Sequence, residues 1–249
     1  MKKPPRSSRQ KEPTSSAAPS LEANGADLEA RRAQRLKTVA LLRTGRVPLQ
    51  VVAVAEQAEA TADAAVREAL TRQPPHLPPA CREGCAWCCY KTVGTAAPEV
   101  LRIAAHLLQT RTPEQLHTIQ ARIKALLEQR RAMRSERRSH PRLPCAMLVE
   151  DRCAIYPVRP LTCRGFNSSD ARQCQWSLEP GSQVSVPSYA PQQRLCTFVL
   201  DGMRAGLEES RLDGQLLELT AALDIALSVP DAAERWLAGE KVFAPARLP

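Results

Sequence analysis

The chain has 249 residues, which is enough for one large or two small domains, and 43% of them are hydrophobic, as in ordinary soluble proteins. Basic residues outnumber acidic ones, so the formal net charge is +9. No stretch has the roughly 18 consecutive apolar residues that a membrane helix needs, so a spanning protein is excluded. The basic first residues lack the apolar run of a secretory signal, so we expect a cytoplasmic protein.

The first third of the chain predicts a tail followed by two helices. Residues 1–27 are rich in Pro, Ser, Ala and basic residues, which is typical of a disordered basic tail. A helix is expected to begin at Leu28 and end at Gly45, with one apolar stripe: Leu28, Leu36, Val39 and Leu42. An alanine-rich helix follows Pro48, and the proline-rich segment 73–80 is expected to end it. Residues 28–75 are therefore predicted to be an N-terminal helical region.

The rest of the chain is also mainly helical in pattern. Pro98 suits the first turn of a helix, and two apolar stripes follow it: Val100, Ile103, Ala104 and Leu107, then Leu116, Ile119, Ile123 and Leu126. The second helix is expected to continue into a basic extension that ends near Arg142. Residues 143–190 show no period, and residues 191–249 predict C-terminal helices that pack on the core. Strand signals are nearly absent, so the fold class is mainly α, with helical flanks around an irregular loop segment.

Eight of the nine cysteines lie between residues 81 and 174. The first four are Cys81, Cys85, Cys88 and Cys89. On a helix, these four thiols would share one face about 100° wide. A metal or a cluster needs several soft ligands that converge in this way. Because Cys88 and Cys89 diverge by about one helical step of 100°, they can serve two adjacent sites.

The other four lie in the irregular segment, at Cys145, Cys153, Cys163 and Cys174. Thiols on a loop-rich stretch indicate a metal that takes the place of a hydrophobic core. Eight thiols suffice for two four-sulfur sites or for one cluster and one ion, and all-sulfur ligation favours zinc or iron, including an iron–sulfur cluster. Buried free thiols and a disulfide scaffold are the alternatives, and the scaffold requires an oxidising compartment. Cys196 lies on a helical stripe with Leu195 and Val199, so we expect it in the core.

These cysteine runs resemble the YkgJ-type cysteine-cluster proteins, from about Pro79 to Phe198. The resemblance rests on CREGCAWCCY and on PCAMLVEDRCAIYPVRPLTCRGF, followed by a further Cys. The second block carries the family's pattern at these positions: Cys145, Cys153, Ile155, Tyr156, Arg159, Pro160, Cys163 and Arg164. One departure is the first gap, from Cys81 to Cys85, which has three residues instead of two.

The resemblance implies zinc or iron chelation by residues 76–190. The implied metal ligands are Cys81, Cys85, Cys88, Cys89, Cys145, Cys153, Cys163 and Cys174. Relatives with this signature include methylases of flagellin lysines, so an iron–sulfur or metal-dependent enzyme that acts on protein or peptide is an alternative. No nucleotide-binding loop and no Ser/His/Asp set is present, and no catalytic residue is assigned. Cys85 and Cys88 formally make a CxxC motif, but no thioredoxin-like βαβ pattern surrounds it.

Side chains around the cysteines have two interpretations each. Arg159 and Arg164 either offset the negative charge of thiolates or pair with Glu150 and Asp151 to fix the loop. Aromatic side chains either shield the metal from water or pack in the core, and the residues concerned are Trp87, Tyr156 and Phe166. The glycines Gly84 and Gly165 are predicted to meet backbone requirements.

The positive charge is concentrated in two places, away from the cysteines. Residues 1–47 carry a net charge of +7 and residues 119–142 carry +6, whereas the remaining spans are slightly acidic. Such segments either track the phosphates of a nucleic acid or are solvated charge on a tail and an exposed helix. No aromatic residues interleave with either run, so base stacking has no support. A nucleic-acid-binding module with structural zinc is therefore a second alternative.

Overall fold

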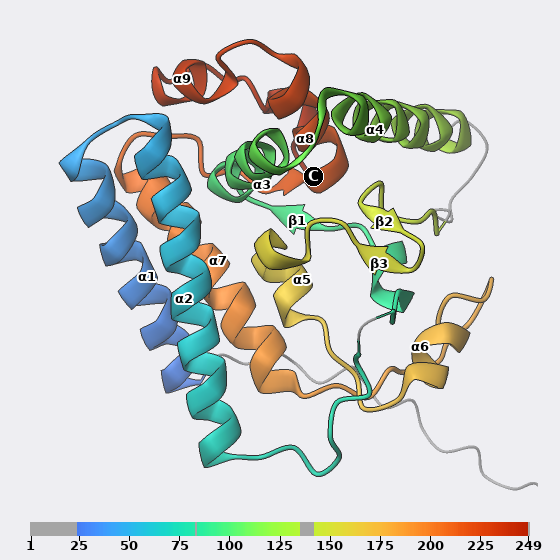
Figure 1. Cartoon of the computed structure of the whole chain (residues 1–249). Helices are drawn as coiled ribbons and strands as arrows, with labels where there is room; N and C mark the ends of the chain where they lie inside the picture. Colours follow the sequence, from blue (N-terminus) through green and yellow to red (C-terminus); the bar gives the residue numbers. More distant parts are fainter. Residues whose placement is uncertain (1–23, 83, 135–141, 249) are drawn as a thin grey trace, which may run out of the picture.

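Figure 1 shows the computed structural model of the protein, which describes residues 24–82, 84–134 and 142–248. The described residues form nine α-helices and two small two-stranded sheets, so the mainly α prediction is confirmed. Most of the predicted tail and the end of the predicted basic extension lie outside the described residues. No described helix is long and apolar enough to cross a membrane.

Three long helices form one layer of the molecule. They are α1 (Gly25–Thr44), α2 (Pro48–Arg72) and α7 (Ala190–Glu209), and Figure 1 shows them side by side. A proline in its first turn begins α2, as predicted. The alanine-rich face of α2 is fully buried at Ala55, Ala58 and Ala62, because small side chains let the neighbouring helices approach closely.

The predicted apolar stripe of α1 is half wrong. Val39 and Leu42 are buried, but Leu28 and Leu36 are 51% and 49% exposed. The helix also begins at Gly25, three residues before Leu28, because Asn24 accepts a hydrogen bond from the Asp27 backbone and caps it. The spacing of the apolar residues along α1 was therefore not enough to identify its buried face.

Glycines on α7 explain which face of α1 is buried. A Cβ at Gly202 would lie 2.3 Å from the Arg31 carbonyl oxygen, and one at Gly206 would lie 2.6 Å from the Cβ of Thr38. The two helices therefore approach too closely for long side chains between them. The buried contact face of α1 includes small and polar side chains such as Gln34 and Thr38 instead.

A second group of helices covers the other side of the core. It contains α3 (Ala97–Thr110), α4 (Pro113–Arg134), α8 (Leu219–Ser228) and α9 (Ala232–Leu237). All four predicted apolar positions of α3 are buried, and so are those of α4 except Leu116, which is partly buried. Strand β1 (Gly94–Thr95) pairs antiparallel with β4 (Leu217–Glu218), which lies within residues 191–249, where helices were expected.

The cysteine-bearing parts of the chain contain only short elements, which lie to the right of the three-helix layer and below α4 in Figure 1. In chain order they are the 3-10 helix η1 (Trp87–Tyr90), the hairpin of β2 (Leu148–Val149) and β3 (Arg152–Cys153), the 3-10 helix η2 (Tyr156–Val158), α5 (Leu161–Gly165) and α6 (Ala171–Trp176). A last 3-10 helix, η3 (Ala244–Ala246), packs on α8 near the end of the chain.

A buried carboxylate ties the irregular segment 143–190 to α3. The Glu99 side chain accepts hydrogen bonds from the backbone nitrogen of Leu161 at 2.7 Å and from that of Ala96 at 3.0 Å. The Thr95 hydroxyl lies 2.8 Å from the same carboxylate. Glu99 therefore fixes the start of α5, two residues before Cys163, against the first turn of α3.

Candidate metal site

The first cysteine run does not lie on one helix, so the condition for a single shared helical face is not met. Only Cys88 and Cys89 belong to a helical element, the short η1. Gly84 has a φ of +80°, a left-handed conformation that glycine adopts without strain. The preceding backbone is held by a distant partner, because the nitrogen of Ala80 donates to the Ser168 carbonyl at 2.7 Å. This long-range hydrogen bond ties the segment to the loop before α6, and the Cys85 nitrogen donates to the Arg82 carbonyl at 3.0 Å to close a turn.

Four cysteines line one small cavity of about 120 Å³: Cys81, Cys85, Cys88 and Cys174. We call them the cavity cysteines. Asp170 places the last of them, because its side chain accepts hydrogen bonds from the first backbone nitrogens of α6, at 2.8 Å from Arg172 and 3.1 Å from Gln173. The Sγ atom of Cys81 donates to the Ser168 carbonyl at 3.8 Å. Trp87 and Phe166 complete the apolar part of the wall.

The other four are Cys89, Cys145, Cys153 and Cys163. The last three pack against the hydrophobic core, and the charges of Cys145 and Cys153 act on Cys89. We call all four the core-side cysteines. The backbone nitrogen of Cys145 donates to the Cys89 carbonyl at 2.7 Å. The β2–β3 hairpin carries Cys153 opposite Leu148. The thiols of Cys145, Cys153 and Cys163 also interact electrostatically with one another. The groups in the structure therefore differ from the two runs in the sequence. Cys174 lies with three cysteines of the first run, and Cys89 lies with three cysteines of the second.

Cys88 and Cys89 connect the two groups. A thiol hydrogen bond with Cys89 lowers the pKa of Cys88, and the charges of Lys91 and Arg159 lower it further against the effect of burial. The same hydrogen bond raises the pKa of Cys89. Burial raises the pKa of Cys145 to about 11 and raises that of Cys163 well above its ordinary value. Metal binding at the core-side cysteines must therefore displace protons.

The two arginines of the second cysteine block, Arg159 and Arg164, lie in different environments. Burial raises the pKa of Cys153 and the charge of Arg159 opposes this, so Arg159 acts on thiols as the charge-offset interpretation expects. Its Nε atom is buried and has no hydrogen-bond partner among the described residues. Its guanidinium lies 3.9 Å from the centroid of the Tyr156 ring.

Arg164 makes ion pairs with Glu59 and Asp63 on α2. The alternative interpretation, in which it pairs with Glu150 or Asp151, is therefore wrong: these two residues form the left-handed turn between β2 and β3. Sequence reasoning missed the role of α2, because Glu59 lies 105 residues before Arg164.

The remaining expectations have clear outcomes. Tyr156 is 60% exposed, so it neither shields the cysteines nor packs in the core.

Cys196 is buried in the core as predicted, and burial raises its pKa to about 12. A Cβ at Gly165 would lie 3.2 Å from the Cβ of Cys196, so glycine favours the close packing of α5 on α7 there. Sequence reasoning missed Lys91, which lines the cavity and lies 5.1 Å from the Phe166 ring centroid.

Part of the predicted basic helix is engaged within the fold. Arg130 of α4 donates to the Glu218 carboxylate at 2.8 Å, and Arg122 donates to the Ala146 carbonyl at 3.3 Å. These two arginines therefore stabilise contacts of α4 with β4 and with the segment before β2. The exposed charge of the helix is smaller than its sequence indicates.

The donor set suits a soft metal ion, since eight thiols lie in two groups with cationic side chains beside them. Within the described ranges, no set of three or more Cys, His, Asp or Glu side chains lies close enough together to hold a metal ion. Zinc–sulfur bonds are about 2.3 Å long, so ligation requires the thiols of a group to draw together. Loops that carry the ligands allow such a movement.

Comparison with known proteins agrees with the position of these thiols. No curated protein and no solved structure matches the chain. One family model does match, and it is described as CxxCxxCC, a putative zinc- or iron-chelating domain. The match contains all eight clustered cysteines and ends before Cys196, and also before Phe198, where the resemblance was expected to end. Residues 80–180 of the chain therefore match the family model of this domain.

Proposed function

We propose that the protein binds zinc or iron through the thiolates of two adjacent four-cysteine sites. One site consists of the cavity cysteines and the other of the core-side cysteines. The observation that carries the proposal is the cavity of about 120 Å³ that four cysteines line, with Cys88 directly followed by Cys89, a member of the second group. Cys196 does not belong to either site, because it is buried among core side chains.

The surrounding side chains suit all-sulfur ligation. A four-thiolate site with a divalent ion carries net negative charge, and Lys91 and Arg159 are the cations that act on its thiols. Trp87 and Phe166 limit the access of water to the cavity cysteines. The bound metal would cross-link loops that have little regular secondary structure, or it would form a cluster with redox chemistry. A reducing compartment such as the cytoplasm keeps these thiols available as ligands.

Metal analysis of the full chain, purified without oxygen, tests the proposal. We expect either a colourless protein with two zinc ions per chain or a brown protein with iron, acid-labile sulfide and broad visible absorption. The variant Cys196→Ala should retain the same metal content, because this thiol lies outside both groups. A protein that takes up neither metal, and whose clustered thiols all react freely with a thiol reagent, would contradict the proposal.

A further inference from the structure

A second and larger hollow lies next to the cavity cysteines. It is open to solvent, has a volume of about 590 Å³, and lies between the end of η1 and the loop of residues 177–186. Lys91 and Ser177 line both the hollow and the cysteine cavity, so the two spaces are neighbours. The family description concerns metal chelation and assigns nothing to this hollow.

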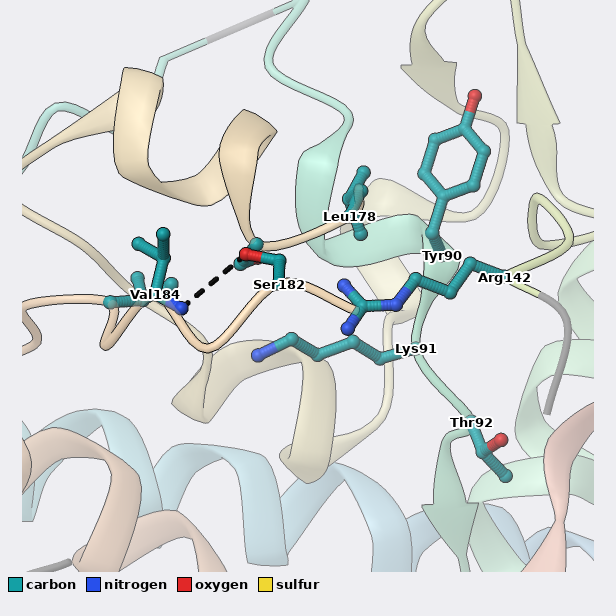
Figure 2. Close-up of a pocket in the computed structure, with 9 residues that line it drawn as sticks. Tyr90, Lys91, Thr92, Arg142, Leu178, Ser182 and Val184 are labelled. Atoms are coloured by element: carbon teal, nitrogen blue, oxygen red, sulfur yellow. Dashed lines mark hydrogen bonds between the residues drawn. The ribbon is translucent and has the colours of Figure 1, made fainter. Parts of the chain in front are cut away.

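Two cationic side chains enter the hollow and no carboxylate lines it. Figure 2 shows Lys91 and Arg142 running in the same direction, with their charged ends toward the loop of Ser182 and Val184. Arg142 is exposed, and the structure gives it no ion pair within the described residues. The one acidic residue of the 177–186 loop, Glu179, is not part of the lining. The electrostatic potential in the hollow therefore favours an anion.

The Ser182 hydroxyl provides a neutral donor on the same wall. Gly181 has a φ of +74°, and the turn it forms is closed by the Ser182 backbone nitrogen, which donates to the Glu179 carbonyl at 3.1 Å. This turn places Ser182 at the hollow. Its Oγ atom accepts from the Val184 nitrogen at 3.3 Å, so the hydroxyl proton is available to a ligand. Tyr90 and Thr92 also line the hollow, with their hydroxyl groups pointing away from the charged ends of Lys91 and Arg142 in Figure 2.

We propose that this hollow binds a small dianionic oxyanion, either a phosphate or a dicarboxylate. An ammonium, a guanidinium and a serine hydroxyl are donors whose hydrogen bonds such groups accept. Arg142 supplies a planar fork of N–H groups, and Lys91 supplies a point charge. An ordinary surface cation lies apart from other cations or pairs with a carboxylate. Lys91 and Arg142 instead line the same hollow, and no carboxylate lines it.

The site is tested by isothermal titration calorimetry on the full chain as purified, with inorganic phosphate and with succinate as the probes. Both anions bind metal ions weakly, so they leave metal on the cysteines. We expect one anion to bind per chain, and raising the salt concentration should weaken binding because the cations are exposed. Binding of phosphate alone would identify phosphate groups as the ligand class, and binding of succinate alone would identify carboxylates.

Matched variants distinguish the site from general surface charge. Arg142→Gln and Lys91→Gln should each weaken binding by about tenfold or more, since each removes a charge-assisted donor. Lys124→Gln removes an exposed cation on α4 and should leave binding unchanged. Metal content, measured in the same samples, should stay the same in Arg142→Gln, which keeps this result independent of the metal sites. Absence of binding for both anions, or equal losses in Lys124→Gln and Arg142→Gln, would overturn the proposal.

Discussion

Arg164 of α5 donates from Nη2 to the Oε2 atom of Glu59 on α2, at 2.6 Å, and so joins the cysteine-bearing segment to the three-helix layer. Arg102 of α3 pairs with the same carboxylate. Burial raises the pKa of Glu59, and the charges of Arg164 and Arg102 act against this rise. The carboxylate therefore depends on both cations. Since Cys163 directly precedes Arg164, the pair also fixes the place of a core-side thiol.

Loss of this ion pair should destabilise the fold. We expect Arg164→Ala to lower the free energy of unfolding by about 2–4 kcal/mol, because a mostly buried carboxylate loses one of its two main partners. Urea unfolding measures this change. The control is Arg72→Ala, which removes an exposed pair with Glu68 and should cost less than about 0.5 kcal/mol. Equal costs for the two variants would show that the buried pair contributes no more than a surface pair.

Single serine substitutions should separate the two proposed metal sites. Cys174→Ser removes a cavity cysteine and Cys163→Ser removes a core-side cysteine, so each should lose about half of the bound metal while the other site stays occupied. Elemental analysis of the purified variants measures this. If both variants lose all metal together, the eight thiols form one interdependent centre and the division into two sites is wrong.

Arg159 should tune metal affinity without being a ligand. Its buried Nε atom has no partner among the described residues, and its charge opposes the raised pKa of Cys153. We expect Arg159→Gln to weaken metal binding by about 10–100-fold, as measured by competition with a chelator. Arg172→Gln, an exposed cation on α6, is the matched control. Unchanged affinity in Arg159→Gln would mean that stacking on Tyr156 is its whole role.

Local periodicity predicted the helices and failed where distant partners decide the backbone. The buried positions of α3 followed from their spacing, since one face of that helix packs on the core. The CREGCAWCC run had helical spacing too, but the Ser168 carbonyl accepts a hydrogen bond from the Ala80 nitrogen and ties the start of the run to a distant loop. That partner is far away in sequence, and no local pattern indicates it. For the same reason, the sequence indicated which eight cysteines to consider as ligands. It did not indicate that Cys174 lies with the first run and Cys89 with the second.

Cys196 should behave as a core residue in every assay. It is 2% exposed, and burial raises its pKa to about 12, so very little thiolate forms near neutral pH. We expect it to resist iodoacetamide at pH values near 8 in the folded, metal-free protein, whereas the exposed Cys81 is alkylated. Cys196→Ala should lower the free energy of unfolding by about 1–2 kcal/mol. Rapid alkylation of Cys196 in the folded protein would contradict its position in the core.

The stability of the protein should also depend on the ionisation of Glu99, in a direction that its burial fixes. Burial raises the pKa of this carboxyl above the value of 4.5 that it has in the unfolded chain, although the backbone nitrogens of Leu161 and Ala96 oppose the rise. Between these two pKa values the folded state binds more protons than the unfolded state. The contribution of Glu99 to stability is therefore fully present below the unfolded pKa and is lost as the pH rises through the folded one.

The variant Glu99→Gln isolates this contribution, because the amide is nearly isosteric with the protonated acid and does not titrate. We expect the free energy of unfolding of the wild type, relative to that of the variant, to fall as the pH rises from about 4 to about 7. Urea unfolding at several pH values measures the difference, and other titrating groups cancel between the two proteins. A relative stability that rises with pH would mean that the two backbone donors outweigh burial and hold Glu99 ionised.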